Sequence, residues 1–318
     1  MHSLFFKSLK LDAFTLHIDD EIFNSAIHDF LSSMVDGHPE LKKILLRYHH
    51  NEYFCEFRDE LLVALCNLSL LEVIEFKFTR NNLVHHQALN ACTAKKVKLD
   101  LSNIHNEDLR QIQFKAMEEL TMRNICGLDK SIEEICVKWI NLTYLELDFC
   151  IANLNLNVVL ENLIKLKTFK AYFDNAGKLA KCQFDCKSMQ FLDLESLLIQ
   201  NCQEIIGLDK LLHSVPNLKC LNFNFMCIKM RYSTIKALKK LKNLNQLSIL
   251  FKINSKIVVS DDLLLMLRKL FEQVKNISIE FNCQKNHNFN NILKLSFQSH
   301  DYVNVIQYGG WVLSLNCN

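Results

Sequence analysis

The chain has 318 residues, 49% of them hydrophobic, so it is long enough to bury a sizeable core. Its 37 basic and 35 acidic residues give a net charge of +2, which argues against nucleic acid as a partner, because nucleic-acid-binding proteins usually carry a strongly basic face. Only 6 Gly and 2 Pro are present, which argues against disordered linkers and against a sheet built on many tight turns.

Neither a membrane span nor a secretory leader is evident in the sequence. No apolar run has the roughly 18 residues needed to cross a bilayer, and Lys7 and Lys10 interrupt the first segment early. The 13 cysteines are odd in number and scattered. We therefore expect reduced thiols in an intracellular protein, cytoplasmic or nuclear, with no membrane partner.

A short unit with apolar residues at its first, fourth and sixth positions recurs along the chain. Clear copies begin at Leu41, Leu71, Met117, Leu142, Leu194, Leu218, Leu244 and Val274. Weaker copies begin at Ala94 and Leu166, and the pattern extends toward the ends from Phe6 and Ile292. Between the first and last clear copies, the starts are 23 to 30 residues apart. This spacing fits leucine-rich repeats of about 20–29 residues with small insertions.

The segments between the units have apolar residues three and four apart, which predicts helices. The expected helices cover residues 131–140, 157–166, 207–215, 233–241 and 260–274, with a further amphipathic helix at 19–34. Expected N-terminal caps are Asp19 or Asp20, Asp129 or Ser131, Ser233 and Ser260.

Each unit is therefore predicted to form a short strand followed by a helix. Stacked units predict an α/β solenoid of about 10–12 leucine-rich repeats, curved into a horseshoe with a parallel sheet on the concave face and helices on the convex face. We expect one domain, 1–318, with an irregular N-terminal repeat (1–40), regular repeats (41–291) and an irregular C-terminal repeat or cap (292–318).

Strand alternation divides each unit into two faces. An aromatic column at position 8 shares its parity with the apolar positions 4 and 6, which favours the core over an exposed stacking platform. Its members are Tyr48, Phe78, Phe149, Phe173, Phe225, Phe251 and Phe281.

Five cysteines follow the strands at position 9 or 10. They are Cys126, Cys150, Cys202, Cys227 and Cys283. A small buried side chain suits the turn where a strand ends, and the alternative of a metal site lacks any CxxC pair, so we expect scaffold cysteines and no metal.

With this repeat spacing and with cysteines after the strands, the sequence resembles the cysteine-containing leucine-rich-repeat half of F-box/LRR proteins. In that family a helix leads into P-x-L-x-x-L-x-L, and "LLHSVPNLKCLNFNFMC" at 211–227 matches through Pro216, Leu218, Leu221 and Phe223. An F-box before the repeats is not found, because the unit from Phe6 leaves no room for it. The resemblance implies recruitment of substrates to a ubiquitin ligase, with the ligase core as partner only when an F-box lies outside this chain. Ribonuclease-inhibitor-like repeats have a similar pattern and remain the alternative.

Enzyme motifs are not found in the sequence. Neither a Gly-rich phosphate loop nor HExxH or GxSxG occurs, and a Cys–His pair is uninformative among 13 Cys and 12 His. We expect no catalytic residues and no cofactor. The basic stretch "KALKKLKN" at 236–243 is assigned to a solvated helix face, with a membrane or nucleic-acid patch as the alternative.

Positions 3, 5 and 7 of each unit project from the other strand face and form the expected surface for a protein partner. The N-terminal half of this surface is mainly basic, its centre holds an acidic pair, and its far half carries amides and hydroxyls. Tyr and Arg often concentrate binding energy at such surfaces. The predicted contact residues are Arg47, Lys77, Lys98, Arg123, Tyr144, Glu146, Asp148, Lys170, Tyr172, Gln200, Asn222, Asn224 and Gln246.

Overall fold

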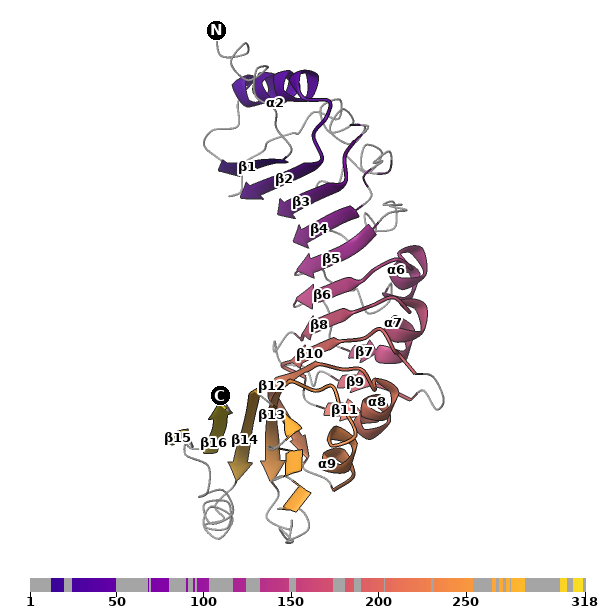
Figure 1. The fold of residues 1–318 in the computed structure, drawn as a ribbon, viewed down its shortest axis with the longest axis vertical. Helices are drawn as coiled ribbons and strands as arrows, with labels where there is room; N and C mark the ends of the chain where they lie inside the picture. Colours follow the sequence, from indigo (N-terminus) through magenta and orange to yellow (C-terminus); the bar gives the residue numbers. More distant parts are fainter. Residues whose placement is uncertain are drawn as a thin grey trace. The chain divides into compact units, whose positions relative to one another are not determined.

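The computed structural model has an α/β fold with parallel sheets (Figure 1). It describes residues 13–19, 25–49, 68, 70–79, 90, 94, 96–102, 117–123, 132–148, 153–173, 181–185, 190–202, 204–229, 232–253, 265–266, 269–270, 273–274, 276–283, 304–307 and 311–316. The chain forms two compact units, unit 1 (Met1–Cys150) and unit 2 (Ile151–Asn318). The predicted unit at Ile292 lies outside the described residues. Of the unit at Phe6 only Ala13 and Phe14 are described, and Phe14 pairs with the fourth-position residue Ile44, five residues later than predicted. The single-domain expectation stays a prediction.

Unit 1 is built on six strands that lie side by side in chain order, each parallel to the next. They are β1 (Ala13–Asp19), β2 (Lys43–His49), β3 (Val73–Thr79), β4 (Lys96–Ser102), β5 (Met117–Arg123) and β6 (Tyr144–Asp148). Helix α2 (Ser25–Gly37) connects β1 to β2, and α6 (Ile132–Lys138) connects β5 to β6. The strand–helix order predicted from the periodicity is therefore present in this unit.

Unit 2 repeats this arrangement with five parallel strands in the order β8-β10-β12-β13-β14. They are β8 (Thr168–Tyr172), β10 (Ser196–Gln200), β12 (Cys220–Lys229), β13 (Gln246–Ile253) and β14 (Asn276–Cys283). Beyond β14 the sheet continues with β16 (Trp311–Asn316) and then β15 (Asn304–Gln307), and β16 runs antiparallel to both of its neighbours, β14 and β15. This reversal departs from the uniform parallel order that the repeat pattern predicts.

A second, three-stranded parallel sheet in unit 2 was not predicted. Its order is β11-β9-β7, from β7 (Asn153–Asn155), β9 (Lys181–Gln183) and β11 (Glu204–Ile206). Strands β7 and β11 run directly into α7 (Leu156–Asn162) and α8 (Leu208–Ser214), and α9 (Tyr232–Leu238) follows β12. The sheet lies beside α7 and α8 (Figure 1).

The described helices are shorter than predicted, and two of the expected cap residues, Asp19 and Ser233, are wrong; the others, Asp20, Asp129, Ser131 and Ser260, lie outside the described residues. Asp19 ends strand β1, and Ser233 lies inside α9, which begins at Tyr232. The side chain of Asn155 instead caps α7 by accepting a hydrogen bond from the Asn157 N–H at 3.1 Å. Of the segment 260–274, residues 265–266, 269–270 and 273 are described as helical.

The core follows the predicted repeat positions closely. All ten residues that start a unit between Leu41 and Val274 are buried. So are the fourth-position residues of nine of these units, Ile44, Ile74, Val97, Leu120, Leu145, Phe169, Leu197, Leu221 and Leu247. Phe173, at position 8, is fully buried, which confirms the inward orientation for that member of the aromatic column; the side chains of the other six members lie outside the described ones.

The same main-chain contact recurs between neighbouring repeats in both units. In unit 1, the Lys42 carbonyl accepts hydrogen bonds from the N–H groups of Glu72 and Val73, at 2.8 and 3.0 Å. In unit 2, the carbonyl of Lys167 accepts from the next repeat in the same way, and those of Glu195 and Lys219 do so in turn. Each repeat therefore holds the start of the following strand by one shared carbonyl.

Candidate partner-binding surface

The candidate surface is the strand face opposite the buried one, and several strands separate the two faces as predicted. In β13 they are not separated, because Ser248, at position 5, is buried together with Leu247 and Ile249. In β6, Leu145 and Leu147 are buried while Tyr144, Glu146 and Asp148 are partly exposed. The same alternation occurs in β5, β8 and β10. Because neighbouring strands are parallel, their partly exposed residues line up in columns across each sheet.

In unit 1, four predicted contact residues form one polar cluster on β5 and β6. The Tyr144 hydroxyl donates a hydrogen bond to the Glu146 carboxylate. The Arg123 guanidinium lies 3.7 Å from Glu146 Oε1 and 3.8 Å from Asp148 Oδ2. The acidic pair predicted at the centre of the surface is thus partly neutralised by a cation from the neighbouring strand.

The basic N-terminal part of the surface is placed by backbone register alone. Arg47 pairs with Lys77 between β2 and β3. The register then shifts between Val97 and Lys98, so that Lys98 lies opposite Glu119. The repeat positions predict Thr121 as the partner of Lys98, and the column is therefore displaced at this point. The side chains of Arg47, Lys77 and Lys98 lie outside those that the structure describes.

In unit 2 the predicted contact residues line up across β8, β10, β12 and β13. Tyr172 pairs with Gln200, and the Lys170 column continues through Leu198 to Asn222. These residues are partly exposed. Gln246 is exposed, and its side-chain oxygen accepts a hydrogen bond from the Cys220 thiol at 3.5 Å. The described part of this face carries amide, hydroxyl, thiol and aromatic groups with one cation, Lys170.

Asn224 falls outside these columns. Phe223 of β12 pairs with Ile249 of β13, and the next pair is Cys227 with Leu250. Asn224 lies in the interval between, where the register shifts, so the sequence-based position 7 does not place it beside its expected neighbours. Its side chain lies outside the described ones.

The described cysteines include three buried thiols and one on the polar strand face. Burial raises the pKa of Cys136 from its ordinary value of 9.0 to about 12, and the Glu133 carboxylate adds to the rise. Burial, with a smaller effect of Cys202, holds the pKa of Cys182 well above its ordinary value. Cys202 is itself buried, and Cys220 is partly exposed. A raised pKa keeps the thiols of Cys136 and Cys182 protonated and unreactive, and the burial of Cys202 fits the scaffold role predicted for it.

Among the described residues, no group of three or more His, Cys, Asp or Glu side chains is arranged to hold a metal ion. No helix in the described ranges combines the length and the apolar character needed to cross a bilayer. The predictions that the protein needs no metal or cofactor stay predictions.

Several side-chain contacts on or near the surface were not predicted from the sequence. Residues at positions 3, 5 and 7 were expected to share a face, but the contact of Arg123 with two carboxylates depends on the register of β5 against β6. The row of amides that links Asn243 to Asn217, and Asn217 to the Leu192 carbonyl, was also missed. The sequence feature that could have predicted this row is an Asn directly before the start of each of two successive units.

Comparison of the chain with known family models and with curated proteins finds no match.

Proposed function

We propose that the chain is a leucine-rich-repeat solenoid that recognises another protein through the polar face of its parallel strands. The separation of the two strand faces carries this proposal. Leu197 and Ile199 of β10 are buried, while Ser196, Leu198 and Gln200 between them are partly exposed. A strand face that is not needed for the core, repeated in register over several strands, provides a broad preformed surface.

The repeat architecture is supported by three features. The residues that start each unit are buried at nearly regular spacing. The shared carbonyl contact recurs from repeat to repeat in each unit. Six parallel strands in unit 1 and five in unit 2 fit the predicted number of about 10–12 repeats. A horseshoe with its sheet on the concave side is the form we propose for this stack.

A protein partner fits the chemistry of the surface better than nucleic acid does. The described face of unit 2 presents Tyr172, Gln200 and Asn222 around one cation, and nucleic-acid binding needs positive charge along the whole path of the phosphates. Tyr and small amide or hydroxyl side chains are typical of protein-recognition surfaces, where Tyr supplies rigid contact area and the polar groups adapt to the partner.

The resemblance to F-box/LRR proteins leads to a narrower form of the proposal. In that form the surface recruits substrates for a ubiquitin ligase, and the ligase core is reached only through an F-box outside this chain. No residue is assigned a catalytic role. A ribonuclease-inhibitor-like scaffold would use the same strand face without any link to ubiquitin.

Site-specific photocrosslinking in cells tests the proposal. A photoreactive amino acid is placed at Tyr172 on the polar strand face and, as matched control, at Glu161, which is exposed on α7. We expect a discrete crosslinked protein from position 172 that is absent from position 161. The purified partner should then bind the unmodified chain and lose affinity with Gln200→Ala and Asn222→Ala. Equal crosslinking from both positions, or none from position 172, would reject the strand face as the binding surface.

A further inference from the structure

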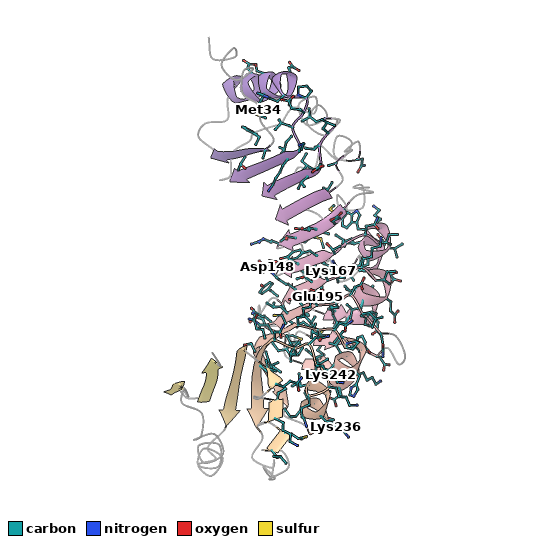
Figure 2. The ribbon with its side chains drawn as sticks, viewed as in Figure 1. Met34, Asp148, Lys167, Glu195, Lys236 and Lys242 are labelled. Carbon is teal, nitrogen blue, oxygen red and sulfur yellow. The ribbon has the colours of Figure 1, made fainter. Side chains whose placement is uncertain are left out.

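Four lysines at the end of α9 form a cationic cluster, the lysine patch (Lys236, Lys239, Lys240 and Lys242). Lys236, Lys240 and Lys242 are exposed and Lys239 is partly exposed. Figure 2 labels Lys236 and Lys242 at the α9 side of unit 2. Four cations within seven residues repel one another, so the arrangement costs free energy unless a counter-charge is supplied.

Neighbouring lysines of the same unit are neutralised, whereas the lysine patch is not. Lys210 of α8 forms an ion pair with Asp185, and Lys219 lies 2.9 Å from Glu195 Oε2. Within the described part of the chain, Lys236, Lys239 and Lys242 form no ion pair. Lys240 Nζ lies 3.3 Å from His213 Nε2, a contact that requires the ring nitrogen to accept and so adds no negative charge.

An exposed apolar row leads up to the lysine patch. Ile164, Leu192 and Pro216 each lie four residues before the strand residues Thr168, Ser196 and Cys220, which pair with one another in register. Lys242 occupies the same place before Gln246. Ile164 is 62% and Leu192 is 54% exposed, and Pro216 is partly exposed.

The row and the lysine patch occupy successive repeats. The Asn217 amide donates to the Leu192 carbonyl at 3.0 Å, and the Asn243 amide donates to Asn217 Oδ1 at 3.3 Å. These bonds tie together the turns that carry Leu192, Pro216 and Lys242. Leu192, Pro216 and Lys242 therefore lie along one line of turns outside the strands.

We propose that the lysine patch and the apolar row together bind an acidic protein segment that carries aliphatic side chains among its carboxylates. The carboxylates would meet Lys236, Lys240 and Lys242, and the aliphatic groups would cover Leu192 and Ile164. The inference is independent of the strand-face function, because none of these residues belongs to the strands.

Two other anionic partners fit less well. A membrane-surface helix inserts a continuous apolar face, but Ile235 and Leu238 of α9 are buried within unit 2. A nucleic acid needs positive charge along the whole path of its phosphates, whereas the lysine patch occupies only seven residues of the chain. An acidic peptide needs only a few carboxylates in this space.

Fluorescence anisotropy with a labelled short peptide, leucines set among glutamates, tests the proposal on the full chain. Lys236→Gln combined with Lys242→Gln should weaken binding about tenfold and reduce its salt dependence. The matched control, Lys210→Gln combined with Lys219→Gln, changes the net charge equally but removes lysines that already have carboxylate partners. It should bind the peptide like the unmodified chain. Equal weakening in both double variants, or no binding to the unmodified chain, overturns the proposal.

Two further comparisons define the partner class. Ile164→Ser combined with Leu192→Ser should weaken binding of the leucine-containing peptide and leave an all-glutamate peptide unaffected. A short single-stranded oligonucleotide and phosphatidylserine vesicles serve as competing anions. If either binds more tightly than the peptide, and loses that binding with the Lys236 and Lys242 changes, the lysine patch belongs to that class and the proposal is wrong. Gln200→Ala, on the strand face, should leave peptide binding unchanged.

Discussion

Arg123 lies directly opposite Asp148 in the register of β5 and β6, and its guanidinium reaches that carboxylate at 3.8 Å and Glu146 at 3.7 Å. The two carboxylates are mostly buried, with 12% and 19% of their side chains exposed, while 39% of Arg123 is exposed. Arg123 therefore reduces the repulsion between two acidic groups that water screens only in part.

Arg123→Ala should lower the free energy of unfolding by about 1 kcal/mol, the upper end for a partly exposed ion pair. The loss should shrink when Glu146→Gln and Asp148→Asn are already present, because the repulsion is then gone. Urea denaturation of the single, double and triple variants measures this coupling. An unchanged effect of Arg123→Ala in the neutral background would contradict the ion-pair role.

Tyr172 and Phe173 are adjacent in sequence but face opposite sides of the sheet. Phe173 is fully buried, so Phe173→Ala should lower the free energy of unfolding by about 3–5 kcal/mol. Tyr172 is partly exposed, so Tyr172→Ala should lower the free energy of unfolding by about 1 kcal/mol or less. The same change should weaken binding of the protein partner proposed for the strand face. Denaturation curves of the two variants compare the faces directly. Similar losses would mean that the assigned faces are wrong.

Gly207 occupies a place that no other residue can fill without rearrangement. Its φ is +80°, and a Cβ atom there would lie 1.8 Å from the Phe184 carbonyl oxygen. Gly207→Ala should therefore lower the free energy of unfolding by more than about 2 kcal/mol.

Asn201 provides the control for this prediction, because it also has positive φ, 59°. Asn201→Gly should be nearly neutral, and Asn201→Ala should cost about 1 kcal/mol. Thermal or urea unfolding separates backbone strain from the clash. If Gly207→Ala costs no more than Asn201→Ala, the close approach to Phe184 has no energetic weight.

The thiols should differ in reactivity according to burial. Cys220 is partly exposed, whereas Cys136, Cys182 and Cys202 are buried. Brief iodoacetamide treatment of the folded protein at about pH 8, followed by peptide mass spectrometry, should label Cys220 and spare the three buried thiols. Denaturant should expose all four. Preferential labelling of Cys182 in the folded state would contradict this prediction and would indicate a reactive cysteine.

The buried thiol of Cys136 should also make stability depend on pH in the alkaline range. Its pKa is about 12 in the folded protein, against an ordinary value of 9.0. Above about pH 9 the unfolded chain loses this proton while the folded chain keeps it, so the free energy of unfolding falls by about 1.4 kcal/mol per pH unit from this group.

Cys136→Val removes this contribution, and the remaining titrating groups are shared by both proteins. The difference in free energy of unfolding between the natural chain and the variant should be constant up to about pH 9 and then shift against the natural chain. Urea denaturation at several pH values follows this difference. A constant difference through about pH 10 would show that the folded thiol ionises normally.

The part of the fold that follows from local alternation could be predicted from the sequence. Leu145 and Leu147 point inward and Tyr144 and Glu146 outward because neighbouring strand residues face opposite sides, and burial of the repeat-start leucines follows from their spacing. Helix position was predictable for the same reason, but helix ends were not, as Ser233 within α9 illustrates.

Features that depend on two distant segments were not predictable. Register is a property of two paired strands and cannot be recognised in the sequence of either strand alone. This applies to the shift between Val97 and Lys98 and to the interval that contains Asn224. The strands β7, β9 and β11 have three residues each, too few to show alternation. For the candidate surface, the sequence indicated which residues share a face but not that Arg123 would meet both carboxylates.

The antiparallel strand β16 covers the edge of β14, the last of the parallel strands in the main sheet of unit 2. Without it, β14 would offer a bare edge of amide and carbonyl groups, the kind of edge on which one molecule can add to another in endless succession. Because β16 pairs with β14, the sheet ends instead at β15, whose four residues offer a shorter row of such groups than the eight residues of β14. The antiparallel pair, which the repeat pattern did not predict, therefore shortens the edge at which another chain could add a strand.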